Sequence, residues 1–410
     1  MIAGAKKAET IVETGDGALA APGTAAKKMA VVVIERIDEL ARYVEQWEAL
    51  AARALEPNPF YEPWMLMPAL RAFGEGRKLK LVLIFDPTRL GSSQRPALRG
   101  FFPLEIKPAY EGLGTKLPLK TLSLWRHKYC YICTPLVGGE RARDTIEAFF
   151  DWIERENFGC PLMELEQIPG EGPFRQLLVD HFNMSGRLSF VSESFTRALF
   201  RPSASAEDYL SAALPGIRRK ELRRLEKRLS ETGRLEYSEL GPGAEVEGWI
   251  SEFLELEAIS WKGQEGRALL SKPEDRDFFT EAARSAFREG RLMMLSLRLD
   301  GRPIAYKCNF TASGGSFAFK IAYDDDYARF SPGVLLEVEN IRRMHDRIDV
   351  EWMDSCADPD NFMINRLWPG RLTIQSMVVA TGRMPGDFVV SSIPMLKWLN
   401  RKLLGRGADR

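Results

Sequence analysis

The strongest constraint on the fold is a run of three apolar, strand-like segments between residues 291 and 327. The run reads RLMMLSLRLDGRPIAYKCNFTASGGSFAFKIAYDDDY. It is interrupted at Asp300-Gly301 and again at Ser313-Gly314-Gly315. Residues of these types adopt the backbone angles that short hairpin turns require. The segment therefore predicts a three-stranded antiparallel β-meander.

A helix is predicted directly after this meander, in SPGVLLEVENIRRMHD at residues 331–346. The first backbone N–H groups of a helix have no partner within the helix and lie at the positive end of its dipole, so they bind phosphate groups. Gly333 allows a ligand to approach the backbone closely, and Arg329 adds positive charge. The predicted pyrophosphate site consists of Arg329, Ser331, Gly333 and Val334. The alternative is an ordinary helix start with Ser331 as its N-cap.

The remainder of the chain repeats this alternation of strands and helices. Its 410 residues are enough for two domains of about 100–200 residues each. We predict a disordered tail at 1–28, an N-terminal domain at 29–192, a C-terminal domain at 193–385, and a C-terminal amphipathic helix and tail at 386–410. Such alternation predicts an α/β fold in both domains.

Five segments of the second half resemble a known superfamily. They are RRKELRRLEKRLSETG, FLELEAISWKGQEGRALLS, LDGRPIAYKCNF, FKIAYDDDYARFSPGVLLEVENI and MDSCADPDNFMINRLWPGR, within residues 195–375. In order and spacing they resemble the GNAT superfamily of acyltransferases. The whole chain looks like the two-domain acetyltransferases of cellulose and exopolysaccharide biosynthesis, which are related to the Fem aminoacyltransferases. The first half matches weakly, through NPFYEPWMLMPAL and CYICTPLVGG.

The resemblance implies an α/β (α+β) fold with two tandem GNAT-like domains, each a mixed, largely antiparallel sheet flanked by helices. It also implies acetyl-CoA or another acyl-CoA as the donor, bound where the meander meets the helix. The phosphate loop departs from the superfamily pattern, because Gly333 comes one position late after Arg329 and Leu335 occupies the second small position. The identity of the donor therefore stays open.

Three residues near the predicted donor site are candidates for proton transfer. Acyl transfer needs a base for the attacking amine or hydroxyl and an acid for the leaving thiolate. Asp354 ends the apolar segment EWMDS and is the predicted base, with an ordinary edge-strand or turn aspartate as the alternative. Tyr323 and Tyr327 are the predicted acids, with packing of their rings as the alternative.

The acceptor side is predicted from Trp261-Lys262-Gly263, which closes a helix resembling the acceptor-side element of the superfamily. We predict that Lys262 pairs with an anion of the acceptor and that Trp261 stacks on a sugar or an acyl chain. The alternative is a lysine on the helix dipole with Gly263 as the cap. Lys320 alternates with apolar residues in FAFKIAY, so we expect it to face away from their side, toward the acceptor cleft or solvent.

Cys130 and Cys133 have the C-x-x-C spacing of metal and redox sites, within a predicted strand region at 119–137. The sequence has no second such pair, and its histidines are scattered at His127, His181 and His345. We therefore predict ordinary strand cysteines and no metal. Five cysteines, an odd number, suggest no disulfide framework, and this indicates a reducing cytoplasm.

Residues 205–233 read as one helical region, and its part at 217–232 is strongly basic. The cationic residues are Arg218, Arg219, Lys220, Arg223, Arg224, Lys227 and Arg228. The ordinary interpretation is a surface helix with solvated charges. The alternative is a patch for a polyanion: the donor phosphates, a lipid-linked sugar or an RNA acceptor stem.

Overall charge restricts the partners. Lys and Arg total 57, as do Asp and Glu, so we expect no general attraction to DNA or to an anionic membrane. No stretch approaches the ~18–20 apolar residues of a membrane span. We predict a cytoplasmic, acyl-CoA-dependent N- or O-acyltransferase whose acceptor is a sugar or a lipid-linked precursor. The alternatives are a Fem-like aminoacyltransferase that uses aminoacyl-tRNA, and a catalytically silent GNAT-fold binding or assembly subunit.

Overall fold

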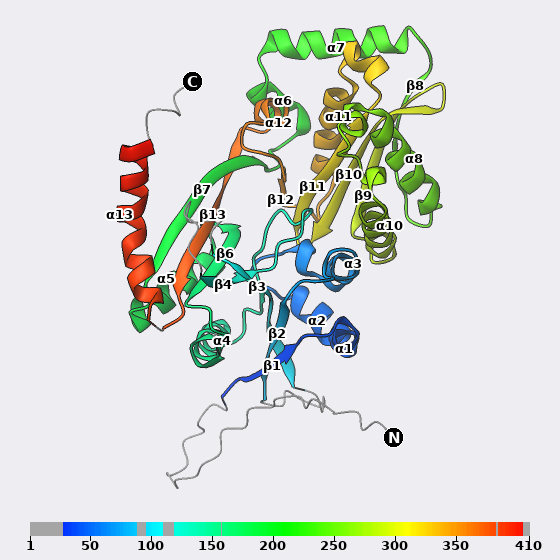
Figure 1. Ribbon diagram of the computed structural model, residues 1–410. Helices are drawn as coiled ribbons and strands as arrows, with labels where there is room; N and C mark the ends of the chain where they lie inside the picture. Colours follow the sequence, from blue (N-terminus) through cyan, green and yellow to red (C-terminus); the bar gives the residue numbers. More distant parts are fainter. Residues whose placement is uncertain (1–27, 88–95, 110–118, 157, 383, 405–410) are drawn as a thin grey trace. The chain divides into compact units, whose positions relative to one another are not determined.

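A computed structural model describes residues 28–87, 96–109, 119–156, 158–382 and 384–404 of the chain (Figure 1). The described chain forms two compact units. Unit 1 consists of the chain up to residue 63, residues 76–194 and the chain from residue 374 on, and unit 2 consists of residues 64–75 and 195–373. The chain passes from unit 1 to unit 2 after Ser194.

Unit 1 contains a sheet with the strand order β1-β2-β3-β4-β6-β13, in which β5 also pairs with β3. The strands are β1 (Ala30–Ile34), β2 (Leu79–Asp86), β3 (Ala97–Pro108), β4 (Lys120–Leu124), β5 (Leu136–Val137), β6 (Leu162–Pro169) and β13 (Gly370–Ala380). The helices are α1 (Ile37–Leu40), α2 (Val44–Ala51), α4 (Ala142–Glu156), α5 (Pro173–Ser185) and α13 (Gly386–Leu404), with 3-10 turns η1 (Ala41–Tyr43) and η2 (Pro59–Tyr61).

Unit 2 contains a sheet with the strand order β7-β12-β11-β10-β9-β8. The strands are β7 (Ser189–Phe200), β8 (Leu235–Glu239), β9 (Leu292–Leu299), β10 (Arg302–Ala312), β11 (Gly315–Tyr323) and β12 (Trp352–Asp354). The helices are α3 (Pro63–Phe73), α6 (Ala206–Ala213), α7 (Gly216–Ser230), α8 (Val246–Ile259), α9 (Trp261–Gln264), α10 (Pro273–Arg288), α11 (Pro332–Asp346) and α12 (Phe362–Leu367), with 3-10 turns η3 (Leu269–Ser271) and η4 (Asp325–Phe330). Among the described helices, none is both long and apolar enough to cross a membrane.

The two sheets share one topology. In each, four antiparallel strands (β1–β4 or β8–β11) are followed by a helix (α4 or α11) and by a fifth strand parallel to the fourth. The sixth strand is antiparallel to the fifth, and it comes from the segment that follows the fifth strand of the other unit: β13 in unit 1 and β7 in unit 2. The predicted meander at 291–327 is confirmed as β9–β10–β11.

This exchange of last strands changes the predicted domain boundaries. From Ile374 onward β13 pairs with β6, so the chain after this point belongs to unit 1 and not to a domain that extends to residue 385. Conversely, α3 belongs largely to unit 2. Trp64 of this helix lies with its ring centroid 5.4 Å from that of Phe310. These assignments depend on pairing partners far away in the sequence, which periodicity does not reveal.

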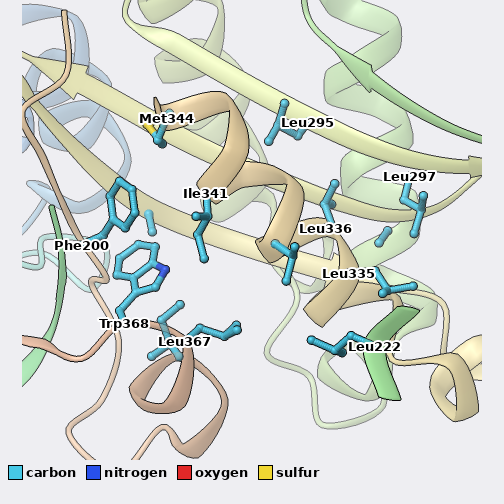
Figure 2. Close-up of a cluster of buried hydrophobic side chains, with 14 of the residues drawn as sticks. Phe200, Leu222, Leu295, Leu297, Leu335, Leu336, Ile341, Met344, Leu367 and Trp368 are labelled. Carbon is cyan, nitrogen blue, oxygen red and sulfur yellow. The ribbon is translucent and has the colours of Figure 1, made fainter. Parts of the chain in front are cut away.

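Helices cover the two faces of the unit 2 sheet differently. Figure 2 shows α11 with Leu336, Ile341 and Met344 packed against the strands, and with Leu335 near Leu222 of α7, within one buried apolar cluster. The opposite face carries aromatic side chains that contact α8 and α10: the ring pairs are Phe253–Tyr306, Phe253–Phe279 and Phe279–Phe319.

The helical region predicted at 205–233 forms two helices, α6 and α7. Leu214 separates them with extended angles, φ −118° and ψ 130°. Pro215 follows it, and a residue before proline is disfavoured in the helical conformation because the proline ring clashes with it. The prediction of one continuous helix is therefore wrong at this position.

Candidate functional site

In unit 2, strands β11 and β12 separate after a short parallel contact. Their ladder is limited to Gly315–Phe317 of β11 and Trp352–Asp354 of β12. Strand β11 continues to Tyr323. The C-terminal half of β11 therefore has an edge that β12 does not pair.

Helix α11 begins beside the end of this edge. Ser331 precedes the helix in the left-handed conformation, with φ 53°, and its carbonyl accepts the N–H of Val334 at 2.9 Å. Within the described chain the Ser331 side chain makes no capping hydrogen bond, so it is not a side-chain N-cap. Gly333 is buried, and a Cβ at this position would lie 3.2 Å from the ring of Tyr323 and 3.7 Å from the side chain of Ile321.

The other residues predicted around this helix start have distinct environments. Burial and the Asp325 carboxylate raise the pKa of the Tyr323 phenol, which makes it a weaker proton donor. Tyr327 packs against the apolar cluster of unit 2. Arg329 is exposed, with its guanidinium 4.8 Å from the centroid of the Phe330 ring.

Asp354 ends β12, and its carboxylate is buried in an ion pair. Oδ2 accepts a hydrogen bond from Arg197 at 2.5 Å, and Oδ1 accepts one from the backbone N–H of Cys356 at 3.0 Å. The side chains of Asp354 and Arg197 are 0% and 3% exposed. A role as the base would require this buried carboxylate to take up a proton while it is paired with Arg197.

A register shift in β11 sets the direction of Lys320. Cys308 of β10 faces Lys320, whereas the next residue of β10 faces Ala318, so β11 carries one extra residue here. Such a β-bulge re-aims a side chain relative to strict alternation. Lys320 consequently bonds the carboxylate of Glu257 on α8, the helix that covers the same face as Phe319. The prediction that Lys320 faces away from its apolar neighbours is therefore wrong for Phe319.

A buried charge cluster lies where α8 and α9 meet β11. The carboxylate of Glu257, 0% exposed, accepts Nζ of Lys320 at 2.8 Å and lies 3.8 Å from Nζ of Lys262. Its other oxygen accepts the backbone N–H of Leu269 at 2.8 Å. Lys262 donates to the backbone carbonyl of Ile321 at 2.7 Å. The structure thus brings both predicted acceptor-side lysines to one carboxylate and to the edge of β11.

The environment of Lys262 perturbs its protonation. Burial, and after it the positive charge of Lys320, lower the pKa of its ammonium to about 8, and Glu257 opposes the change. Trp261, 38% exposed, has the cations of Lys262 and Arg267 at 5.9 and 5.8 Å from its ring centroid. Trp261 and Lys262 begin α9, in a tight turn that follows the end of α8.

Gly263 is what allows this turn. A Cβ at Gly263 would lie 1.7 Å from the carbonyl oxygen of Ala258, so any other residue would force the backbone to move. In the alternative interpretation of the sequence, Gly263 caps the helix. The structure gives it a steric role in placing α9 against the end of α8.

Sequence reasoning missed Glu257, although the sequence contains a signal for it. Ile250, Phe253 and Leu254 form the apolar stripe of α8, and Glu257 follows at the next position of the i, i+3, i+4, i+7 pattern. A carboxylate in a buried stripe requires charged partners, because an unpaired buried charge is strongly unfavourable. That requirement points to the two lysines.

The equivalent place in unit 1 is filled by the chain itself. Strands β4 and β6 also pair in parallel over three residues, Thr121–Ser123 with Leu162–Glu164. Residues 125–135 then leave the sheet, and Cys133 of this segment donates its N–H to the Gln167 carbonyl of β6 at 3.0 Å. Loop residues therefore occupy the edge of β6 beyond its contact with β4.

The C-x-x-C pair belongs to this loop, not to a strand as predicted. Cys130 and Cys133 are buried with their Sγ atoms 3.7 Å apart. Burial and the neighbouring Cys133 raise the pKa of the Cys130 thiol well above its usual value. Within the described residues, no group of three or more His, Cys, Asp or Glu side chains is placed to hold a metal ion.

Sequence comparison assigns the domain type of the second half. Residues 217–362 match the Acetyltransferase (GNAT) domain family. A comparison with curated proteins finds no match. The matched range begins in α7 and ends at the start of α12, so it contains the meander, the β11–α11 junction and the Glu257 cluster.

Solved structures align over most of this chain. A conserved protein of unknown function from Bacteroides thetaiotaomicron aligns with a TM-score of 0.51 and 11% identity, over 83% of this chain and 97% of that one. FemX aligns with a TM-score of 0.53 and 10% identity, over 85% and 98%. A tandem GNAT protein from the clavulanic acid biosynthesis pathway aligns with a TM-score of 0.42 and 13% identity, over 87% and 99%.

The match defines residues 217–362 as an acyltransferase domain of GNAT type. Unit 2 carries the acetyltransferase domain. The α/β fold class expected from the sequence is confirmed.

Proposed function

We propose that unit 2 transfers an acyl group from acetyl-CoA or another acyl-CoA to an amine or hydroxyl group. One observation carries this proposal. The C-terminal half of β11 has an edge that β12 does not pair, and α11 begins beside the end of that edge. In this proposal the backbone N–H groups around Ser331–Val334 bind the donor pyrophosphate. The thioester lies along β11, where backbone N–H groups polarise its carbonyl.

Only unit 2 is proposed to bind the donor. In unit 1 the segment 125–135 bonds to β6 where β4 and β6 diverge, and its residues Cys130, Ile132 and Cys133 are buried. A donor in unit 1 would have to displace this packed segment. We therefore expect one donor per chain.

The acceptor is proposed to be a sugar or a lipid-linked precursor, within cell-surface polysaccharide synthesis. The support is the sequence resemblance described above, together with the partly exposed ring of Trp261 beside the lysine cluster. We place the reaction in the cytoplasm, because all five cysteines are free thiols, as is usual in a reducing compartment.

A donor panel tests the proposed function directly. Thermal shift and calorimetry on the full chain, with CoA, acetyl-CoA, a long-chain acyl-CoA and tRNA, are expected to show one acyl-CoA site per chain. A ligand at about 100 times its Kd adds about 2.7 kcal/mol to the stability of a protein that it binds only in the folded state. Absence of binding by every CoA compound would instead support a silent binding or assembly subunit.

An aminoacyl-tRNA donor is the second candidate, and helix α7 is the observation that favours it. Lys220, Arg223, Arg224, Lys227 and Arg228 are exposed, and none of them forms an ion pair within the described chain. Arg218 and Arg219, in contrast, pair with Glu221 and Glu207. Helix α7 also borders a cavity of about 110 Å³, between α6, α7, β8 and α11.

The salt dependence of tRNA binding separates the two candidates. An RNA site loses affinity with a slope near −0.7 to −0.9 per phosphate contact in a plot of log K against log salt. A site for one small phosphate ligand gives a shallow slope. For the acyl-CoA donor, we expect tRNA to bind weakly to wild type and to a variant with Arg223, Arg224 and Arg228 changed to Gln.

The matched control carries three Gln substitutions on α10, at Arg276, Arg284 and Arg288, and therefore the same change of net charge. Tight tRNA binding that the α7 variant loses and the α10 variant keeps would replace acyl-CoA by aminoacyl-tRNA as the proposed donor.

A further inference from the structure

We propose that Lys262 is the catalytic residue that exchanges the proton during acyl transfer in unit 2, with Glu257 and Lys320 as its positioning residues. The inference rests on the proposed function and assigns a group that the proposed function leaves open. It changes the role expected from the sequence, in which Lys262 binds an acceptor anion and stays charged.

The first argument is position. Lys262 Nζ lies 2.7 Å from the backbone oxygen of Ile321, in the half of β11 that β12 leaves. The side chain of Ile321 lies 3.7 Å from the place of a Cβ at Gly333. Ile321 of β11 thus bonds the amine of Lys262 through its backbone and lies beside the start of α11 with its side chain. A donor whose pyrophosphate lies at Gly333 extends toward this amine along β11.

The second argument is the distribution of charge. Glu257 is nearer to Lys320, at 2.8 Å, than to Lys262, at 3.8 Å, so Lys320 takes the stronger ion pair. The hydrogen bond of Lys262 goes to a neutral carbonyl, and its side chain is only 21% exposed. A buried ammonium with an incomplete counter-charge loses its proton more easily.

The groups that face Lys262 come from each element around it. They are Glu257 of α8, Lys320 of β11, Arg267 after α9, and, next to Lys320 and Glu257, the Cys308 thiol of β10. Burial raises the pKa of this thiol, so it stays neutral. The two cations favour neutral Lys262, and the carboxylate favours its charged form. The effects of these charges and of burial together place the pKa of Lys262 at about 8.

Lys262 alone can accept and return the one proton that the reaction moves. The neutral amine of Lys262 accepts the proton of the attacking hydroxyl or neutral amine as the new bond to the acyl carbon forms. The carbon–sulfur bond then breaks, and the ammonium of Lys262 returns the proton to the thiolate of CoA. The products are the acylated acceptor and free CoA thiol, and Lys262 ends neutral. A group that titrates near the working pH suits both half-steps.

The other candidates fit this role less well. Both oxygens of Asp354 already accept hydrogen bonds, and its side chain is 0% exposed. The phenol of Tyr323 has a raised pKa, so it gives up a proton less readily than an unperturbed tyrosine.

Trace acetylation of the full chain with acetic anhydride, at pH values from about 6 to 11, tests the titration without any substrate. Peptide mass spectrometry gives the pH midpoint at which each lysine becomes reactive. We expect Lys262 to have its midpoint near pH 8. Lys220 and Lys227 on exposed α7 serve as internal standards for the midpoint of Lys262. A Lys262 midpoint equal to these standards overturns the inference.

A charge variant checks the cause of the shift. Lys320→Met removes a positive neighbour and leaves the carboxylate of Glu257 to Lys262, so the midpoint of Lys262 should rise. A lower midpoint in this variant would contradict the role given to Lys320.

Two substitutions of Lys262 separate proton exchange from charge. Lys262→Arg keeps a cation that stays protonated, and Lys262→Met removes the group. Proton exchange predicts that both lose about 100-fold or more in turnover, and that the rise of wild-type kcat with pH to a plateau above about pH 8 disappears. Retained turnover in Lys262→Arg would overturn the inference and restore an anion-binding role.

Calorimetry with CoA distinguishes a failure of the Lys262 role from a failure of the proposed acyl-CoA donor. We expect wild type and both Lys262 variants to bind CoA with similar affinity. If wild type fails to bind CoA, the proposed donor is wrong whatever the labelling midpoint is. If wild type binds CoA but Lys262 titrates as an ordinary lysine, only the present inference fails.

Discussion

Replacing Gly333 by valine is expected to lower the affinity for CoA by about 100-fold while the chain stays folded. Gly333 is buried at the start of α11, and a Cβ would already lie 3.2 Å from the Tyr323 ring. The valine methyl groups add bulk where the proposed pyrophosphate lies. Losing one or two hydrogen bonds to a charged group, at about 1.5–3 kcal/mol each, corresponds to a change of this size.

Gly216→Val is the matched control. Gly216 also lies in the first turn of a helix, α7, and a Cβ there would have no other atom within 4 Å. This variant should bind CoA as wild type does and should show the same thermal midpoint. Calorimetry on both variants gives the comparison. Equal CoA affinity in wild type and a folded Gly333→Val protein would show that the donor binds elsewhere.

Asp354→Asn is expected to lower the thermal stability of the protein strongly. The substitution removes the negative charge that faces Arg197 at 2.5 Å, and both side chains are almost completely buried. Loss of one partner from a buried ion pair destabilises a protein by about 3–5 kcal/mol. For a unit of this size, that corresponds to a fall in Tm on the order of 10 °C, measurable by calorimetric scanning.

A double variant separates this structural role from the catalytic role predicted for Asp354. Arg197→Met with Asp354→Leu removes both charges, and such replacements are often neutral for stability. We expect the double variant to recover both Tm and turnover relative to Asp354→Asn. Recovery of Tm with turnover still about 100-fold low would make Asp354 the base and contradict our assignment of Lys262.

Local sequence patterns were sufficient for the elements around the candidate site. The turns at Asp300-Gly301 and Ser313-Gly314 predicted the meander, and both Asp300 and Ser313 adopt positive φ angles, of 51° and 36°. The helix expected at 331–346 is α11, Pro332–Asp346. Turn chemistry and helical periodicity act between residues a few positions apart, so a single sequence displays them.

The direction of Lys320 and the pairing of Glu257 required the tertiary structure. The extra residue in β11 exists only relative to its partner β10, because a bulge is a mismatch between two strands. Strict alternation along one strand therefore gave the wrong side for Lys320. Glu257 and Lys320 are 63 positions apart, and no local pattern links them.

The sequence alone thus determined the meander and the helix that follows it, and it indicated two α/β halves with the acyltransferase resemblance in the second. The tertiary structure decided which strands complete each sheet, as β7 and β13 show. It also decided which charges meet: Arg197 with Asp354, and Lys262 and Lys320 at Glu257. The physical reason is that these contacts join residues distant in the chain, and their energies depend on burial that only the packed fold creates.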